Sequence, residues 1–370
     1  MAKVSIDAVM STFPRCPLCH LPTPLEKLPA LSRELGINLF VKRDDQTGLA
    51  FGGNKSRKLE FVIGDALSKG AVSIITWAGV QSNWCRQLAA ASRKVGIKPI
   101  LVLFRRPGLP ADVDGNLLLD YLLDAEIHVK DLGTRDMMSF SGVLDFIQPI
   151  VEQERASGRI TYVAPIGAAL AEGSMTRPLG AIAYVDATAE LLTQAQTLGI
   201  HVDHVVTATS SGSMQAGLIA GAKFLNAGFR TTGIAVSDDT ATLTALVSEI
   251  VDQVTRNEFR ETVKLTADDV IVNDEYIGEG YGITNAETIS AITTTAVADG
   301  LLLDPVYTGK AMRGLFDLAK RGYFQSVENV VFLHTGGLPA LFPYRTELTD
   351  YLSARAKVGG EETAALKYSR

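Results

Sequence analysis

The sequence contains little cysteine: three in 370 residues. An odd, small number in so long a chain implies no disulfide framework. Two of them lie in Cys16-Pro17-Leu18-Cys19-His20, which has the spacing of a c-type haem attachment site. Haem attachment would require export, and zinc would require two further ligands where only Cys85 and scattered histidines remain. We therefore interpret this segment as a loop and expect no metal site.

Long hydrophobic runs are also missing. No apolar run approaches the roughly 20 residues that span a bilayer, and residues 1–7 lack a continuous apolar segment of the signal-peptide type. The net charge is −6 without a clustered basic face, which argues against nucleic acid and anionic membranes as partners. We expect a cytoplasmic protein with a small-molecule substrate.

Apolar material is nevertheless abundant, since 46% of the residues are hydrophobic and 21% are charged. The length suggests two domains of roughly 150 residues each. Short β-branched runs alternate with longer helical patterns, which predicts an α/β protein of βαβ units with parallel sheets buried on both faces. The expected strands are 39–42, 73–77, 99–104, 126–129, 160–163, 204–208, 232–236 and 329–333, and the expected helices include 83–95, 180–198, 213–227 and 285–299.

One lysine has an unusual setting, the run Gly52-Gly53-Asn54-Lys55-Ser56-Arg57-Lys58 between a predicted strand and a predicted helix. The glycines allow the backbone to pass close to a ligand. Neighbouring positive charge lowers the pKa of a lysine, and a neutral amine can attack a carbonyl to form a Schiff base. The alternative is an exposed turn that begins a solvated basic helix.

Two further loops join a strand to a helix. Ser82 and Asn83 could simply cap the helix that they precede, and the dipole of a helix N-terminus also favours an anion. The stretch 209–217 is rich in small residues whose backbone amides could cradle a phosphate, although a tight turn with a serine cap would have the same composition.

Several motifs, in order along nearly the whole chain, resemble those of the pyridoxal-phosphate enzymes of the ACC deaminase and D-cysteine desulfhydrase family. They are 41–45 with 52–60, 80–83, 280–282, 303–310 and 334–337. The resemblance implies fold type II, the tryptophan synthase beta-like fold, with two domains that are each an open, mostly parallel sheet flanked by helices. It places a small domain, 61–179, within a large domain formed by 1–60 and 180–370. It also implies pyridoxal 5'-phosphate as cofactor, an amino acid as substrate and a homodimer.

The same resemblance assigns roles to individual residues. Lys55 would hold the cofactor and move the substrate Cα proton, Ser82 would face the substrate carboxylate, and Tyr281 and Tyr307 would lie near the substrate. The predicted cofactor contacts, besides Lys55, are Asn83 at the phenolic oxygen, Ser211, Gly212 and Ser213 at the phosphate, Thr308 at the pyridine nitrogen, and Lys58 and Thr335.

Thr308 separates the candidate reactions. ACC deaminases typically have glutamate there, which can keep the ring nitrogen protonated, whereas a hydroxyl cannot. Elimination tolerates the change because a good leaving group departs as the carbanion forms. The sequence therefore favours a β-eliminating lyase, with D-cysteine as the best candidate. The alternatives are a cysteate sulfo-lyase, an ACC deaminase and a ligand-binding homologue without catalysis.

The sequence departs from the family pattern at three places. Met214 replaces a common threonine in the phosphate loop, Trp84 follows Asn83 where histidine or glutamine is more usual, and residues 170–177 form an apparent insertion that could be a lid or an oligomer contact. Of the histidines, His334 ends a strand and fits a bonded core residue better than a catalytic one. We interpret His201 and His204 as structural.

Overall fold

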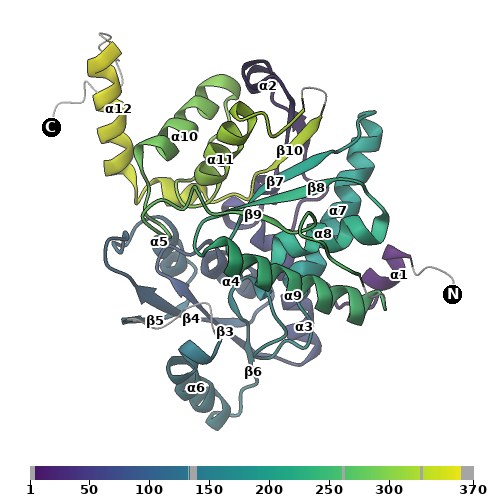
Figure 1. Ribbon diagram of the computed structural model, residues 1–370. Helices are drawn as coiled ribbons and strands as arrows, with labels where there is room; N and C mark the ends of the chain where they lie inside the picture. The colour runs from purple at the N-terminus through teal and green to yellow at the C-terminus, as the bar shows by residue number, and fades with distance from the viewer. Residues whose placement is uncertain (1–4, 132, 134–139, 261–262, 326–327, 360–370) are drawn as a thin grey trace.

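The strands form two sheets in a computed structural model that describes residues 5–131, 133, 140–260, 263–325 and 328–359 (Figure 1). Six strands follow the order β1-β2-β10-β7-β8-β9, all parallel except β1 against β2. Four parallel strands follow the order β5-β4-β3-β6. The bounds are β1 Leu25–Lys27, β2 Asn38–Lys42, β3 Ser73–Gly79, β4 Lys98–Arg105, β5 Glu126–Asp131, β6 Thr161–Val163, β7 His204–Thr209, β8 Arg230–Ala235, β9 Ile271–Asn273 and β10 Asn329–Leu333.

The predicted fold class is confirmed, and each predicted strand is present to within a few residues. The three-residue strands β1 and β9 escaped prediction, whereas β6, which is equally short, was predicted. The four-stranded sheet is formed by chain that lies between β2 and β7. This is the arrangement expected of an inserted small domain, and the boundaries at residues 60 and 180 stay a prediction.

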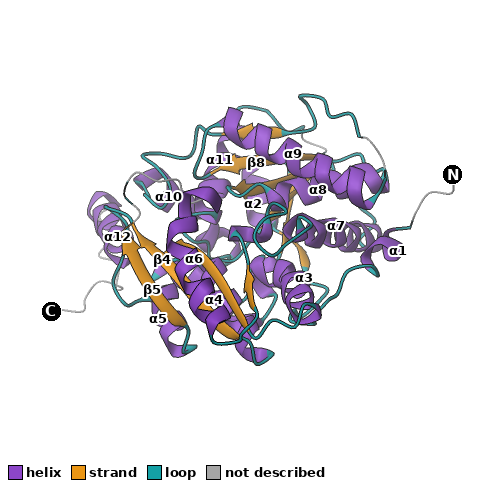
Figure 2. Cartoon of the chain, turned by 90° about the horizontal axis from the view of Figure 1, so that it is seen from below, coloured by secondary structure: helices purple, strands orange, loops and turns teal. Residues whose placement is uncertain are grey.

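Helices cover both faces of each sheet (Figure 2). In the six-stranded sheet, Leu39 and Val41 pack with α2, α10 and α11, whereas Phe40 between them packs with α7 and α8. Alternate residues of a strand point to opposite faces, so β2 is buried on both faces and its central residues Leu39, Phe40 and Val41 are all apolar. The helices are α1 Ile6–Met10, α2 Pro29–Leu35, α3 Lys55–Ser68, α4 Asn83–Lys94, α5 Gly115–Leu122, α6 Phe140–Ala156, α7 Leu179–Thr197, α8 Ser213–Leu225, α9 Thr240–Glu258, α10 Ala286–Asp299, α11 Thr308–Lys320 and α12 Arg345–Gly359.

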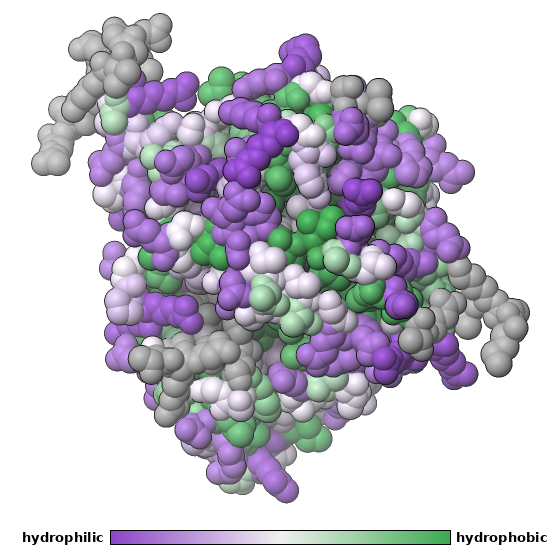
Figure 3. Space-filling model, viewed as in Figure 1, coloured by the Kyte–Doolittle hydropathy of each residue, from purple (hydrophilic) through white to green (hydrophobic). Residues whose placement is uncertain are grey.

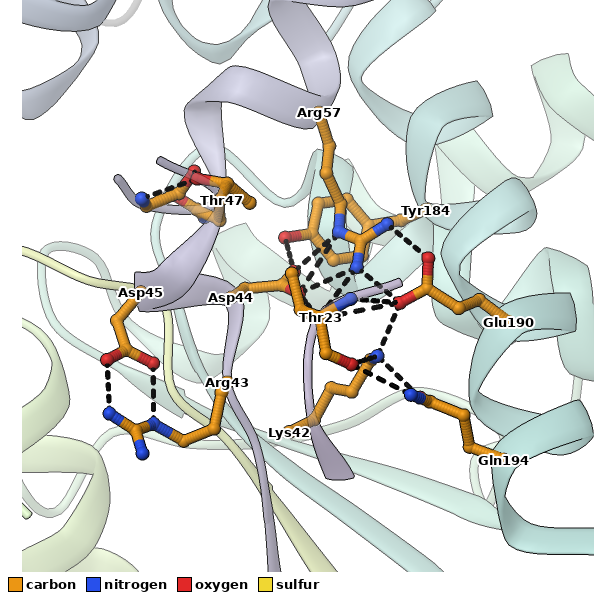
Figure 4. A network of polar contacts seen from close by, with 12 residues as sticks. Thr23, Lys42, Arg43, Asp44, Asp45, Thr47, Arg57, Tyr184, Glu190 and Gln194 are labelled. Atoms are coloured by element: carbon orange, nitrogen blue, oxygen red, sulfur yellow. Dashed lines mark hydrogen bonds and ion pairs between the residues drawn. The ribbon is translucent and has the colours of Figure 1, made fainter. Parts of the chain in front are cut away.

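A buried ionic network anchors α3, the helix that begins with Lys55 (Figure 4). Arg57 donates to Asp44 at 2.9 to 3.1 Å, to Glu190 on α7 at 2.7 and 3.0 Å, and to the hydroxyl of Thr23 at 2.9 Å. Lys42 of β2 pairs with the same Glu190. The start of α3 is thereby tied to β2, α7 and the N-terminal segment. We name this cluster the Arg57 network, with members Thr23, Lys42, Asp44, Arg57, Tyr184, Glu190 and Gln194.

None of the described helices is long and apolar enough to span a bilayer. Hydrophilic side chains cover most of the face shown in Figure 3, with smaller hydrophobic patches between them.

Candidate active site

A pocket opens where the carboxyl ends of strands from both sheets face each other. Its lining residues lie at or after the ends of β2, β7, β8 and β10 in one sheet and of β3, β4 and β6 in the other. Ligands of open α/β sheets bind in such crevices. The empty space between these residues is about 1070 Å³, open solvent at the mouth included.

Most of the site residues predicted from the sequence meet in this pocket, although they come from distant parts of the chain. The pocket is lined by Lys55, Lys58, Ser82, Asn83, Ser211, Gly212, Tyr281, Tyr307 and Thr335. Ser213 and Thr308 do not line it. Both are fully buried behind its wall and hydrogen-bonded there, Ser213 to Lys58 and Thr308 to Asp304. Their direct contacts with a cofactor stay a prediction.

The two glycines before Lys55 serve the packing of the protein chain itself. Gly52 has a φ of 66° and Gly53 a φ of 125°, where a side chain is strained. A Cβ at Gly52 would lie 2.0 Å from the backbone oxygen of Asp45, and one at Gly53 would lie 2.6 Å from Nε2 of Gln87. The expected close approach therefore occurs, but to neighbouring protein atoms. This packing fixes the backbone of the loop that precedes Lys55 and positions it at the start of α3.

Lys55 lines the pocket and has a perturbed amine. Burial lowers its pKa to about 8, opposed by the negative charge of Asp304 and reinforced by the positive charge of Arg86. Its Nζ atom lies 6.0 Å from the ring centroid of Tyr307. A lysine with this pKa carries a substantial fraction of free amine near neutral pH, as a nucleophile or a general base requires.

An anion cradle lies next to Lys55. Lys58 is buried, and its Nζ atom donates to the hydroxyl of Ser213 at 2.8 Å. Burial and the charge of Lys55 lower the pKa of Lys58 well below its ordinary value. Ser213 begins α8, whose first turn has no side-chain cap, after Gly212 at a φ of 71°. Uncapped amides and a buried lysine amine together suit a phosphate group.

The start of α4 forms a second polar wall. The hydroxyl of Ser82 accepts the backbone N–H of Cys85 at 3.1 Å, so Ser82 caps the helix as well as facing the pocket. Asn83 is the first residue of α4 and is also in the lining. The capping and ligand-facing alternatives are thus compatible, because one residue at a helix N-terminus can do both.

Two tyrosines close the third side. The hydroxyls of Tyr281 and Tyr307 are hydrogen-bonded at 2.5 Å. Burial raises the pKa of both phenols, so both remain protonated at neutral pH. A protonated hydroxyl pair is a proton donor in contact with the pocket.

Asp304 organises this side, and the sequence motif alone assigned it no role. Its carboxylate accepts the backbone N–H groups of Val306, Tyr307 and Thr308, each at 2.9 Å, and the hydroxyl of Thr308 at 2.6 Å. It therefore holds the turn that leads into α11 and fixes the backbone of Tyr307 at the pocket wall.

The departures from the family pattern at Met214 and Trp84 are accommodated within the pocket wall. The sulfur of Met214 accepts the side-chain amide of Asn54 at 3.4 Å, so a weak acceptor takes the place of a hydroxyl. The indole of Trp84 is buried and donates to the hydroxyl of Thr76 at 2.8 Å. Trp84 thus lines the pocket and packs into the core behind it.

The other singled-out segments lie outside the pocket lining. Arg177, at the end of the apparent insertion 170–177, pairs with Glu258 of α9. His334 is fully buried and bonded to the carbonyl oxygen of Leu302 at 2.8 Å, as expected of a core histidine. The backbone N–H groups of Leu18 and Cys19 donate to Glu60, both at 2.8 Å, which holds the Cys-x-x-Cys-His segment as a loop.

The donors of the pocket fit pyridoxal phosphate. The amine of Lys55 suits its aldehyde, the cradle of Lys58 and the α8 N-terminus suits its phosphate, and the amide of Asn83 suits an oxygen on its ring. When bound, this cofactor supplies an electron sink for a carbanion at the substrate Cα.

Comparisons with known proteins agree with this fit. The chain is 38% identical over 348 residues to a Pyrococcus abyssi protein named "Putative 1-aminocyclopropane-1-carboxylate deaminase", covering 94% of this chain and 98% of that protein. It is 36% identical over 342 residues to a D-cysteine desulfhydrase of Klebsiella pneumoniae, covering 92% and 98%. A crystal structure described as an ACC deaminase homologue superposes with a TM-score of 0.83 at 36% identity, covering 94% of this chain and 98% of the other.

A family model described as "Pyridoxal-phosphate dependent enzyme" matches residues 17–336, which contain every residue of the pocket lining. The chain therefore belongs to the pyridoxal-phosphate-dependent enzymes, among the homologues of ACC deaminase and D-cysteine desulfhydrase.

Proposed function

We propose that this enzyme catalyses β-elimination from a small sulfur-containing amino acid, with D-cysteine as the best candidate and pyruvate, ammonia and hydrogen sulfide as products. The observation that carries the proposal is the hydrogen bonding of the Thr308 hydroxyl. Its hydroxyl donates to Asp304 at 2.6 Å and accepts the backbone N–H of Asp304 at 2.8 Å. A hydroxyl engaged in this way supplies no acid to a ring nitrogen, which disfavours ring opening and leaves elimination as the easier reaction.

The residues of the pocket suit such an elimination. Free Lys55 amine, available because its pKa is lowered to about 8, can take the proton from the substrate Cα. Ser82 and the N-terminus of α4 can hold the carboxylate, where the helix dipole favours an anion. The protonated pair of Tyr281 and Tyr307 can donate to the sulfur as the bond from Cβ breaks.

The keto-acid product tests the proposal directly. Purified enzyme is incubated separately with D-cysteine, L-cysteine, cysteate and ACC, and the product is identified. Pyruvate from a cysteine or from cysteate supports elimination and names the substrate. 2-Oxobutanoate from ACC would overturn the proposal, and a Thr308→Glu variant that gained ACC turnover would identify the reason. An absence of turnover and of bound cofactor would favour a ligand-binding homologue.

A second candidate, a cysteate sulfo-lyase, is favoured by one cation in the pocket. Arg106 lines the pocket just after β4, and none of the described side chains forms an ion pair or a hydrogen bond with its guanidinium. It lies close enough to Tyr281 for its charge to oppose the effect of burial on that pKa. An uncommitted guanidinium is suited to an oxyanion such as a sulfonate, through paired N–H donors. The ratio of kcat/KM for cysteate to that for cysteine distinguishes the two candidates.

A further inference from the structure

A second arginine, Arg86, lies behind the pocket and is fully buried in α4. Its guanidinium makes three kinds of contact. Nη1 donates to Oδ1 of Asn83 at 3.2 Å and to Oδ1 of Asn116 at 2.8 Å, and Nη2 donates to the carbonyl oxygen of Gly52 at 3.0 Å. A guanidinium has donors and no acceptor, so every partner must present an oxygen to it.

This requirement fixes the side chain of Asn83. An asparagine amide has an oxygen at one end and an amino group at the other, and rotation by 180° exchanges them. Because Arg86 can only donate, it bonds to the amide oxygen of Asn83. The amino group of Asn83 is therefore the end left for a ligand. Asn83 lines the pocket, so Arg86 determines that this wall offers a donor.

The same arginine holds the loop that carries Lys55. The carbonyl oxygen of Gly52, three residues before Lys55, accepts from Arg86 and also from Nε2 of Gln87 at 2.9 Å. Gln87 in turn accepts the hydroxyl of Ser56 at 2.7 Å. Two consecutive residues of α4 therefore bind the lysine loop on both sides of Lys55.

The third contact of Arg86 connects it, through Asn116, to the loop before α4. Asn116 of α5 accepts from Arg86, and its amino group donates to the carbonyl oxygen of Gln81 at 3.0 Å. Its backbone N–H donates to the side chain of Gln81 at 2.9 Å. Arg86 is thus hydrogen-bonded to three segments, which are the start of α4, the loop before Lys55 and the start of α5.

We propose that Arg86 is a positioning residue, which holds the Lys55 loop against α4 and presents the amino group of Asn83 to an oxygen acceptor on the cofactor ring. This role does not depend on which amino acid the enzyme consumes. It concerns the binding and the orientation of the cofactor, and it can be tested without substrate.

Arg86 also acts on Lys55 through its charge, which contributes to the lowered pKa of Lys55. The carboxylate of Asp120 interacts electrostatically with Arg86, and its oxygens form no hydrogen bond with the described residues. Burial raises the pKa of this carboxyl well above the ordinary value. Burial, opposed by Asp120, lowers the pKa of Arg86 to about 10. The charges that face Lys55 are Arg86, Lys58 and Asp304, with the ring of Tyr307 beside them. Lys58 and Tyr307 line the pocket, whereas Arg86 and Asp304 are fully buried behind its wall.

The test compares Arg86→Lys, Asn83→Ala and the double variant by equilibrium dialysis of the holoenzyme against pyridoxal phosphate. We expect Arg86→Lys to weaken cofactor binding about tenfold, the worth of a hydrogen bond to a charged group. In the Asn83→Ala background the same change should cost clearly less than in the parent, because the part of its effect that acts through Asn83 is already lost and only the contact with the Lys55 loop remains to be removed. Arg93→Lys, the same substitution at an exposed position of α4, is the matched control and should bind as the parent does.

A second readout separates positioning from general destabilisation. The pH midpoint of the visible absorbance of the bound cofactor should shift in Arg86→Lys in the direction produced by Asn83→Ala. If Arg86→Lys does not fold, Asn116→Ala removes one of the acceptors and should show the same dependence on Asn83. Full additivity with Asn83→Ala, or a lowered melting temperature with unchanged midpoint and affinity, would overturn the proposal.

Discussion

Two buried arginines of this enzyme show opposite electrostatic behaviour. Arg57 is 2% exposed and Arg86 is 0% exposed, so burial opposes the charge of each. In the Arg57 network, Asp44 and Glu190 outweigh burial and the pKa of Arg57 lies well above its ordinary value. Behind the pocket, burial dominates and lowers the pKa of Arg86 to about 10. The first arginine has two bonded carboxylates, and the second is bonded to neutral oxygens.

The same contrast exists within one helix. Arg57 points into a neutralised network, whereas Lys55 and Lys58 on α3 have lowered pKa values at the pocket. A neutralised buried charge holds elements together once it is formed. A buried lysine without a bonded carboxylate has a lowered pKa. It can react as a neutral amine, or bind an anion when it is protonated. Helix α3 therefore has a structural face, with Arg57 in the ionic network, and a chemical face, with Lys55 and Lys58 at the pocket.

The strongest test of the chemical face is Lys55→Ala. We expect turnover to fall on the order of 10³-fold or more, because nucleophile and base are both lost. Unfolding free energy should change by less than about 1 kcal/mol, since a desolvated cation is removed with its packing. Rates of keto-acid formation and denaturant titrations measure the two effects. An active variant would mean that another amine performs the chemistry.

The corresponding test of the structural face is Glu190→Gln, which leaves Arg57 and Lys42 short of a carboxylate. Breaking a buried ionic cluster costs about 3–5 kcal/mol of unfolding free energy. The spectrum of the bound cofactor should be unchanged, because Glu190 lies outside the pocket lining. A variant as stable as the parent would show that the network is not what anchors α3.

Acid gives an independent measurement of Glu190. Burial raises its pKa, but Arg57 and Lys42 outweigh burial and lower it to about 2. A depressed carboxyl pKa contributes stability that is fully present above the ordinary value of 4.5 and is lost as the pH falls through about 2. The parent should therefore lose more stability than Glu190→Gln between these pH values, as denaturant titrations would measure. Parallel losses in the two proteins would contradict the assignment.

Lys58→Met should affect cofactor binding more than stability. Removing the cation of the anion cradle is expected to weaken pyridoxal phosphate binding by about 10- to 100-fold, from the loss of a charge-assisted contact. The unfolding free energy of the protein freed of cofactor should stay equal or rise, because an apolar side chain replaces a desolvated charge. Equilibrium dialysis and denaturant titration give the two values. Unchanged cofactor affinity would remove Lys58 from the phosphate site.

The smallest expected effect is a selective one at Arg106. Arg106→Gln should lower kcat/KM about tenfold for cysteate, while leaving cysteine within about twofold, if the guanidinium binds a sulfonate. Arg105→Gln, at the exposed end of β4, is the neighbouring control. Equal losses on both substrates would instead assign Arg106 to the carboxylate that all amino acids share.

Much of the fold could be predicted because its signals are local. The strand that ends at Lys42 and the strand 329–333 are continuous apolar runs, and helices such as Asn83–Lys94 follow strands at regular intervals. The Lys55, Ser82 and Tyr307 motifs were recognisable because each is a contiguous run that resembles the corresponding run of a known family. Arg86 and Arg106 were missed, since a lone arginine in a sequence shows neither its burial nor its partners.

By itself, the sequence determined the α/β architecture through its hydrophobic periodicity. The resemblance of its contiguous motifs to those of a known family indicated the family and nine of the residues that line the pocket. The tertiary structure alone decided which buried charges are neutralised. Arg57 and Glu190 are 133 residues apart and meet, whereas Arg86 meets Asn116 and Gly52 in place of a bonded carboxylate. The effective pKa of a side chain depends on such distant partners and on desolvation, and neither exists until the chain is folded.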